Sequence, residues 1–212
     1  MVERARRLRR WVVTGPVGAG KSLATATLAE LGAHVVDADA EGHAVLREPE
    51  VAVEIDAAFG EGCVVDGRVR RGVLAGIVFA DPRALARLNG ITHARLSARI
   101  AARLDELDRA ADQAGLAVVE AAVYFLLPSF GPVDLVIAVT APPDLRAERL
   151  LRSGRLDASS VRSRMAAQAD LLDDYERADI RIDNVGTENE LRRAVKRIHA
   201  KYWHGHVPGG SI

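Results

Sequence analysis

One stretch of this chain combines glycines, a lysine and a serine at a spacing that suits phosphate binding. Residues 15–22 read Gly-Pro-Val-Gly-Ala-Gly-Lys-Ser, which is the pattern G-x-x-x-x-G-K-S. Glycines let a backbone turn closely around an anion because they carry no Cβ atom, and the N–H groups of such a turn point toward that anion. The Lys21 ammonium can reach the β- and γ-phosphates, and the Ser22 hydroxyl can ligate Mg²⁺. This phosphate loop predicts binding of a nucleoside triphosphate with Mg²⁺.

The residues on either side of the phosphate loop have the pattern that it needs. An apolar, β-branched run at 11–14 predicts a strand before the loop, and the run at 22–31 predicts a helix after it. The N-terminus of that helix directs further partial positive charge at the phosphates. The loop residues that we expect to contact the nucleotide are Gly15, Val17, Gly18, Ala19, Gly20, Lys21, Ser22 and Leu23.

Three acidic residues follow two further predicted strands. Asp37 and Asp39 come directly after the apolar run 33–36, and Glu120 ends the run 116–119. Ligand sites of parallel sheets form at the carboxyl ends of strands, so these acids should face the phosphate loop. We expect Asp39 to accept the proton of an attacking hydroxyl, with Asp37 either in support or capping the next helix. Glu120 is expected to order Mg²⁺ and its waters, or else to be an exposed acid at a strand end.

Two groups of arginines lie in stretches with helical spacing. The first group would stabilise charge on a transferring phosphoryl group, or is solvated, and consists of Arg146, Arg149, Arg152, Arg155, Arg162 and Arg164. The second group forms a stripe that either holds an anionic acceptor or pairs with nearby acids such as Asp105, Glu106 and Asp108. The stripe consists of Arg83, Arg87, Arg95, Arg99 and Arg103. His93 lies near this stripe and either binds the acceptor or packs.

The alternation of apolar and helical runs predicts an α/β fold with a parallel sheet flanked by helices. The predicted strands are the apolar runs at 11–14, 33–36, 116–119, 135–139 and 180–182. A helical insertion is expected at about 45–114 and a second helical segment, a lid, at about 142–175. The remaining core spans about 11–44, 115–141 and 176–203 of one domain, 1–212. This plan is similar to that of nucleoside-monophosphate kinases, in which an insertion holds the acceptor and a lid excludes water.

Composition narrows the class of protein. The 212 residues are 49% hydrophobic and 27% charged with zero formal net charge, which is typical of a globular protein and argues against a dedicated nucleic-acid binder. No apolar run reaches the roughly 18 residues of a membrane span. The single cysteine, Cys63, cannot form an internal disulfide, so we expect a cytoplasmic location. The arginine-rich residues 4–10 are expected to form a solvated extension.

An ordered set of short motifs, spread from about residue 12 to residue 198, resembles the dephospho-coenzyme A kinase family. The set begins with VTGPVGAGKS at 13–22 and DAD at 37–39, and continues in the insertion with VFADP at 78–82 and ITH at 91–93. It ends with RLLR at 149–152, RMAAQ at 164–168 and ADIRIDNVG at 178–186. The phosphate loop alone is shared with many nucleotide-binding proteins, whereas the ordered set is far more specific. The chain departs from the family pattern at Pro16, where members have glycine, and at Ala94, where they have proline.

The resemblance implies a P-loop fold and an activity. It implies transfer of the γ-phosphoryl group of ATP, with Mg²⁺, to the ribose 3′-hydroxyl of dephospho-coenzyme A, with no nucleic-acid or membrane partner. It assigns Asp39 as the base and Arg152 as the lid arginine that acts with Lys21. The residues that it places beside ATP are Arg149, Asn184 and Gly186. The residues expected at the acceptor are Asp37, Asp39, His93 and Glu120.

Two other functions stay open on the sequence. One is a kinase of the same fold that phosphorylates a different small hydroxyl acceptor. The other is a nucleotide-binding protein without kinase turnover, against which the presence of Lys21, Ser22, Asp39 and Arg152 argues. The assembly is expected to be a monomer or a small homo-oligomer.

Overall fold

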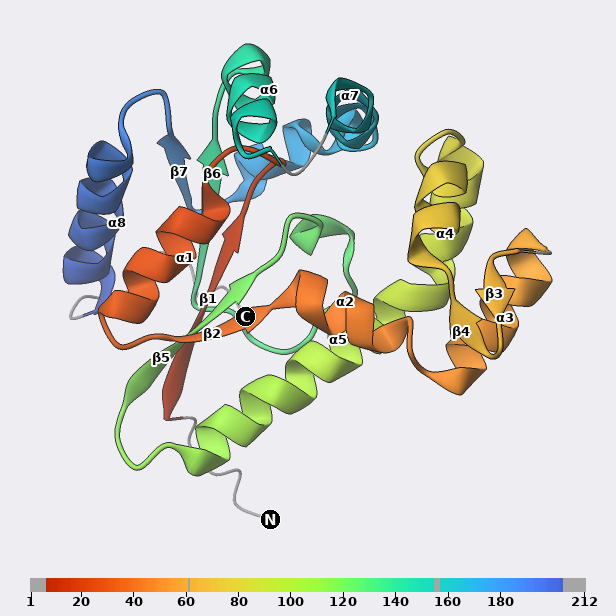
Figure 1. Ribbon diagram of the computed structural model, residues 1–212. Helices are drawn as coiled ribbons and strands as arrows, with labels where there is room; N and C mark the ends of the chain where they lie inside the picture. Colours follow the sequence, from red (N-terminus) through yellow and green to blue (C-terminus); the bar gives the residue numbers. More distant parts are fainter. Residues whose placement is uncertain (1–6, 61, 155–156, 204–212) are drawn as a thin grey trace.

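A parallel sheet forms the centre of the protein. The computed structural model describes residues 7–60, 62–154 and 157–203, and within these residues five strands lie in the order β2-β5-β1-β6-β7 (Figure 1). All neighbouring strands of this sheet run parallel, as the apolar runs predicted. The strands are β1 (Leu8–Thr14), β2 (His34–Asp37), β5 (Gly115–Glu120), β6 (Leu135–Thr140) and β7 (Ile180–Asp183).

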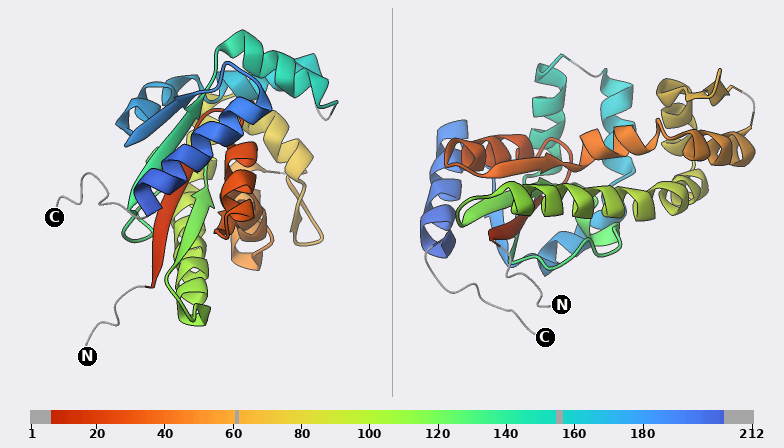
Figure 2. Two further views of the ribbon diagram at one scale, coloured as in Figure 1. Left: turned by 90° about the vertical axis from the view of Figure 1, so that its left-hand side faces the viewer. Right: turned by 90° about the horizontal axis from the view of Figure 1, so that it is seen from below.

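Helices cover both faces of the sheet because alternate side chains of β1 point in opposite directions. Trp11 and Val13 pack with α1 (Lys21–Glu30) and α8 (Glu188–Trp203) on one face. Val12 packs on the other face, against α5. Figure 2 shows α1 and α8 on one side of the strands and the long helix α5 on the other. Burial on both faces explains why the central strands β5, β1 and β6 read as continuous apolar runs, whereas the edge strands β2 and β7 are partly exposed.

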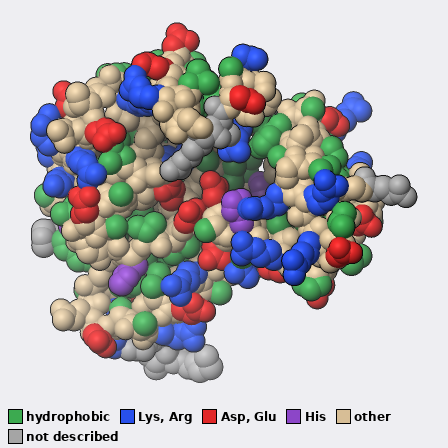
Figure 3. All heavy atoms as spheres, viewed as in Figure 1, with side chains coloured by type: hydrophobic (Ala, Val, Ile, Leu, Met, Phe, Trp, Pro, Cys, Tyr) green, Lys and Arg blue, Asp and Glu red, His purple; other side chains and the backbone are tan. Residues whose placement is uncertain are grey.

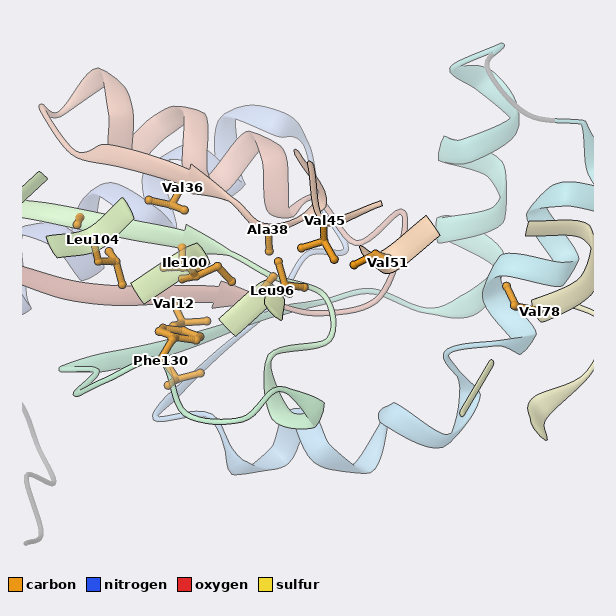
Figure 4. Close-up of a cluster of buried hydrophobic side chains, with 14 of the residues drawn as sticks. Val12, Val36, Ala38, Val45, Val51, Val78, Leu96, Ile100, Leu104 and Phe130 are labelled. Atoms are coloured by element: carbon orange, nitrogen blue, oxygen red, sulfur yellow. The ribbon is translucent and has the colours of Figure 1, made fainter. Parts of the chain in front are cut away.

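Helix α5 (Pro82–Ala110) is shared between the core and the insertion. Its residues Leu96, Ile100 and Leu104 follow one another at four-residue spacing and pack on the sheet near Val12 (Figure 4). The C-terminal half of α5 therefore belongs to the core, whereas we had expected all of 45–114 to be an insertion. Periodicity predicted the helix but not which of its turns meets the sheet.

The rest of the insertion extends away from the sheet. It consists of three helices and a small hairpin, so it begins at Ala38 rather than at about residue 45 and is not wholly helical as predicted. These elements are α2 (Ala38–Val45), α3 (Pro49–Phe59), β3 (Val64–Val65), β4 (Arg68–Val69) and α4 (Arg71–Val78). Asp66 and Gly67 have positive φ and form the tight turn of the hairpin.

The lid is attached to the sheet at its C-terminal end. It contains α6 (Pro143–Arg152), α7 (Ala158–Ala166) and the 3₁₀ turns η2 (Ala169–Leu171) and η3 (Asp173–Arg177). Leu171 and Tyr175 are buried against Ala138 of β6. The Tyr175 hydroxyl also donates a hydrogen bond to the Ala122 carbonyl at 3.1 Å, next to the turn η1 (Tyr124–Leu126). In the described part of the chain, no helix is both long and apolar enough to cross a membrane.

The described arginines near the N-terminus are structural, so the predicted solvated extension is wrong from residue 7 onward. Arg10 lies within β1 and is only 7% exposed. Its Nη2 atom lies 2.8 Å from Asp105 Oδ1, and its N–H group donates to Asp134 Oδ2 at 2.7 Å. Burial of the aliphatic stem and these two carboxylates explain how a strand can contain an arginine. Residues 1–6 lie outside the described residues.

The assignment of the second half of α5 to the core predicts a mutational effect. Leu104→Ala should lower the free energy of unfolding by about 3 kcal/mol because it leaves a cavity beneath the sheet. Arg103→Ala, one residue earlier on the half-exposed side of α5, is the matched control and should change it by less than about 0.5 kcal/mol. Urea unfolding of both variants measures the difference. Equal effects would mean that α5 does not pack as described.

Candidate active site

The phosphate loop has a backbone conformation that only glycine adopts easily. Gly15, Gly18 and Gly20 have φ angles of +134°, +78° and +108°. A Cβ atom on Gly15 would lie 2.0 Å from the Val139 carbonyl oxygen, and one on Gly20 would lie 2.5 Å from Asn184 Nδ2. All three glycines are therefore needed for the curve of the loop, Gly15 and Gly20 also for its contact with the ends of β6 and β7, and Gly18 for its contact with α6 at Arg146. Gly20 is also the N-cap of α1 and supplies no side-chain cap, which leaves the helix N-terminus available to an anion.

Lys21 is held at the loop with two acids nearby. Its Nζ atom donates to the Pro16 carbonyl at 3.2 Å, and the Ala19 N–H group donates to the same oxygen at 3.2 Å. Burial lowers the pKa of the Lys21 ammonium, while the charges of Glu120 and Asp39 raise it. The Pro16 carbonyl therefore accepts both hydrogen bonds and connects the two halves of the loop, although proline has no N–H group of its own. The structure brings Lys21, Glu120 and Asp39 together.

Glu120 connects the end of β5 to the start of α1. The parallel register places Glu120 beside both Val13 of β1 and Asp37 of β2. Glu120 Oε1 accepts from the Ser22 hydroxyl at 2.8 Å, and Oε2 accepts from the Thr25 hydroxyl at 2.6 Å. A carboxylate with two hydroxyls is the all-oxygen donor chemistry that Mg²⁺ requires, so these residues fit the metal. Thr25 was missed on the sequence, although it lies one helical turn after Ser22 and so shares its face.

The two aspartates of the DAD motif have different environments. Asp37 is the N-cap of α2, and its Oδ1 accepts from the N–H groups of Asp39 at 2.8 Å and Ala40 at 3.2 Å. Asp39 is exposed in the first turn of α2, and its charge acts on Lys21. Figure 3 shows acidic side chains beside a hollow between the sheet and the insertion, with basic side chains on the insertion side. Of the two, Asp39 is the acid whose side chain is not occupied by helix capping.

A second set of contacts surrounds the loop after β7. Asn184 Nδ2 donates to the Ala19 carbonyl at 2.8 Å, which ties that loop to the phosphate loop. Arg149 Nη2 donates to the carbonyls of Asn184 at 3.0 Å and Gly186 at 3.4 Å. Arg149 Nη1 is buried and has no hydrogen-bond partner among the described residues. A buried donor without an acceptor is unfavourable, so a bound group would stabilise it. Leu23, the last of the loop residues expected to contact the nucleotide, packs its side chain into the apolar cluster between the sheet and helices α1 and α8.

The arginines of α6 are not equivalent. Arg152 lies on the exposed side of the helix and pairs with Glu148, so the structure does not bring it to the phosphate loop. Arg146 is only 3% exposed, and its guanidinium donates to the carbonyls of Ala141 at 3.1 Å and Val17 at 3.5 Å. Burial lowers the pKa of Arg146, and no carboxylate of the described residues is within ion-pair distance. On the sequence Arg146 was one member of the first arginine group and had no role of its own; its place just after the end of β6 was the available signal.

Most of the arginine stripe of α5 forms ion pairs. Arg95 pairs with Glu54 of α3 at 2.6 Å, Arg99 with Glu41 of α2 at 2.9 Å, and Arg103 with Glu106 at 2.9 Å. These contacts favour the interpretation of a salt-bridged surface, with partners on α2 and α3 that the sequence did not suggest. The stripe thus holds the insertion helices together.

His93 lies apart from the phosphate loop, on the insertion side. Its Nδ1 atom is 3.3 Å from the carbonyl oxygen of Leu126, in the turn after β5. Burial lowers the pKa of the His93 imidazole, and the hydrogen bond to that carbonyl partly opposes the shift. This contact joins α5 to the segment that follows Glu120.

An opening separates the insertion from the lid. A cleft of about 290 Å³ lies between the α4 segment, which contributes Gly76 and, directly after the helix, Phe79, and α7, which contributes Ser160 and Arg164. The Arg164 guanidinium lies 6.0 Å from the centre of the Phe79 ring, so lid and insertion meet across this cleft. The described lining of this cleft comes from the insertion and the lid.

Comparisons with known proteins agree with this geometry. The chain is 38% identical over 196 residues to a dephospho-CoA kinase of Deinococcus radiodurans, over 90% of this chain and 92% of that protein. A crystal structure from Thermus thermophilus superposes with a TM-score of 0.71 at 29% identity, over 93% of this chain and 99% of that one. A dephospho-CoA kinase structure from Campylobacter jejuni has the same fold, with a TM-score of 0.54 at 23% identity over 92% of this chain and 97% of that one. Residues 11–190 match the family model described as dephospho-CoA kinase, and the chain belongs to that family.

Proposed function

We propose that this protein transfers the γ-phosphoryl group of ATP to the ribose 3′-hydroxyl of dephospho-CoA and forms coenzyme A and ADP, the last step of coenzyme A biosynthesis. The observation that carries the proposal is the convergence of Lys21, Glu120 and Asp39 at the ends of neighbouring strands, in a chain of this family. A loop for the triphosphate and an acid for the acceptor hydroxyl are the two groups that such a transfer requires.

The nucleotide would be bound by the phosphate loop and the segment after β7. The loop N–H groups and Lys21 would receive the phosphates, and Arg149, Asn184 and Gly186, which are connected to one another or to the phosphate loop by hydrogen bonds, would lie beside the adenine. Ser22 and Glu120 are the residues that would hold Mg²⁺, which when bound neutralises charge on the β- and γ-phosphates. The buried Arg146 guanidinium adds positive charge directly behind the loop at Val17.

Transfer would proceed in one displacement. The 3′-hydroxyl oxygen forms a bond to the γ-phosphorus as the bond to the β,γ-bridging oxygen breaks and ADP leaves. Asp39 orients this hydroxyl and accepts its proton. Lys21 neutralises charge on the phosphates throughout, and the lid excludes water that would otherwise accept the phosphoryl group. Arg152 would reach that group only after leaving Glu148.

We also propose that the protein acts in the cytoplasm, as a monomer or a small homo-oligomer. The single cysteine, Cys63, is buried as a free thiol, which suits a reducing compartment.

The reaction itself is tested by measuring ADP and coenzyme A formed from ATP, Mg²⁺ and dephospho-CoA, with mass analysis of the product. Equimolar, acceptor-dependent formation of both is expected. Lys21→Ala should abolish turnover because the phosphates lose their neutralising cation. Lys196→Ala, an exposed lysine on α8, is the control and should retain full activity. Turnover in the Lys21 variant, or ADP without coenzyme A in the wild type, would contradict the proposal.

The proposed division of labour between the two aspartates is tested by amide substitution. Asp39→Asn should reduce kcat by about 10²–10⁴-fold, because the base is lost, with little change in ATP affinity. Asp37→Asn should reduce kcat far less, since asparagine also caps helices well. Steady-state kinetics and calorimetric ATP binding distinguish these results. A wild-type kcat in Asp39→Asn would remove Asp39 as the base.

Substitutions of Arg146 and Arg152, at opposite ends of α6, should affect different steps of the reaction. Arg146→Met should weaken ATP binding by about tenfold, because it removes a buried positive charge next to the loop. Arg152→Ala should slow phosphoryl transfer by about tenfold or more with ATP and acceptor binding nearly intact. Arg103→Ala on α5 controls for loss of an exposed arginine. Binding and single-turnover rates separate the effects, and a purely acceptor-side defect in the Arg152 variant would disprove its role.

A further inference from the structure

A glutamine of the lid holds the backbone of the phosphate loop. Gln168 Oε1 accepts a hydrogen bond from the Val17 N–H group at 2.7 Å, between residues 151 positions apart. The carbonyl of the same residue, Val17, accepts from the Arg146 guanidinium at 3.5 Å. Gln168 and Arg146, which come from two segments of the lid, therefore bind the backbone N–H and carbonyl groups of Val17. No sequence motif assigned Gln168 a role, although it ends the motif RMAAQ.

Gln168 stands where an exposed helix meets an anchored turn. Before it, the nine-residue helix α7 has one buried residue, Val161. After it, Leu171 and Tyr175 are buried against Ala138 of the sheet. The chain is thus fixed on one side of Gln168 and weakly held on the other. The hydrogen bond to Val17 sets the position of α7 relative to the phosphate loop.

The chemical type of this side chain suits its place beside a polyanion. A carboxamide oxygen accepts from the Val17 N–H group and carries no net charge. A carboxylate would also accept, but it would add a negative charge next to the triphosphate. A hydrocarbon of the same length would leave the N–H group without its partner.

We propose that Gln168 is the positioning residue that couples the lid to the phosphate loop during the transfer proposed above, on which this inference rests. By fixing the end of α7 at Val17, Gln168 holds the lid over the γ-phosphate and keeps water away from it. Gln168 acts through the lid and the loop and is not itself assigned a contact with the reacting atoms.

Three variants test the coupling. Gln168→Met keeps the length of the side chain without its acceptor, and Gln168→Glu keeps an acceptor but adds charge. Gln113→Met, at an exposed glutamine before β5, is the matched control. For each variant we would measure kcat, both KM values and the ratio of ADP to coenzyme A formed. We would also measure the dissociation rate of a fluorescently labelled ATP analogue with Mg²⁺.

The expected results distinguish positioning from simple folding support. Gln168→Met should lose about tenfold in kcat, the scale of one hydrogen bond, with an unchanged KM for dephospho-CoA. It should form ADP in excess of coenzyme A and release the nucleotide faster, with a melting temperature within about 3 °C of the wild type. Gln168→Glu should restore equimolar products but raise the KM for ATP. Gln113→Met should match the wild type in every measurement.

Other results would overturn the coupling. Equimolar products with an unchanged kcat in Gln168→Met would do so, as would Gln168→Glu forming as much excess ADP as Gln168→Met. If the wild type forms no coenzyme A, the proposed function fails on its own. The nucleotide dissociation rate does not involve the acceptor, so it still decides the coupling: an equal rate in Gln168→Met and the wild type would overturn it.

Discussion

The close approach of the phosphate loop to the ends of β6 and β7 is the constraint on which the rest of the site depends. Gly15 lies so near Val139, and Gly20 so near Asn184, that neither position has room for a Cβ atom. This packing fixes the loop before any ligand is present. It also determines where α1 begins, and so where Ser22 and Thr25 present their hydroxyls to Glu120. The parallel register then aligns Glu120 with Asp37, the residue that starts α2 and carries Asp39.

The same packing concentrates positive charge without enough acceptors. Lys21 and Arg146 are desolvated, and each has its pKa lowered by burial. Arg149 has a buried nitrogen without a partner among the described residues. Burying cations in this way lowers the free energy of unfolding compared with a site lined by apolar side chains. A triphosphate would supply the missing negative charge and acceptors, so the site is complementary to an anion that the protein itself does not provide.

Sequence patterns predicted the features that depend on neighbouring residues. They did not predict the contacts that depend on how distant segments pack. The phosphate loop and the five strands were predicted because glycine spacing and apolar runs are visible within a few residues. The partners of the α5 arginines, such as Glu41 for Arg99, were not, because they come from helices 40 to 60 positions away. Arg146 and Arg152 look alike in the sequence, and only the rotation of α6 turns one to the loop and the other to solvent. Ala94 sits where the family has proline, and α5 runs through it without a break.

The motif at 164–168 contacts two elements that lie far from it in the sequence. Arg164 meets Phe79 of the insertion, and Gln168, four residues later, meets Val17 of the phosphate loop. One short segment is therefore in contact with both the insertion and the phosphate loop. A cation over an aromatic ring and one hydrogen bond are each weak, so neither contact alone fixes α7. Together they favour the arrangement in which the lid contacts both the insertion and the phosphate loop. Exclusion of water matters in this arrangement for the proposed transfer.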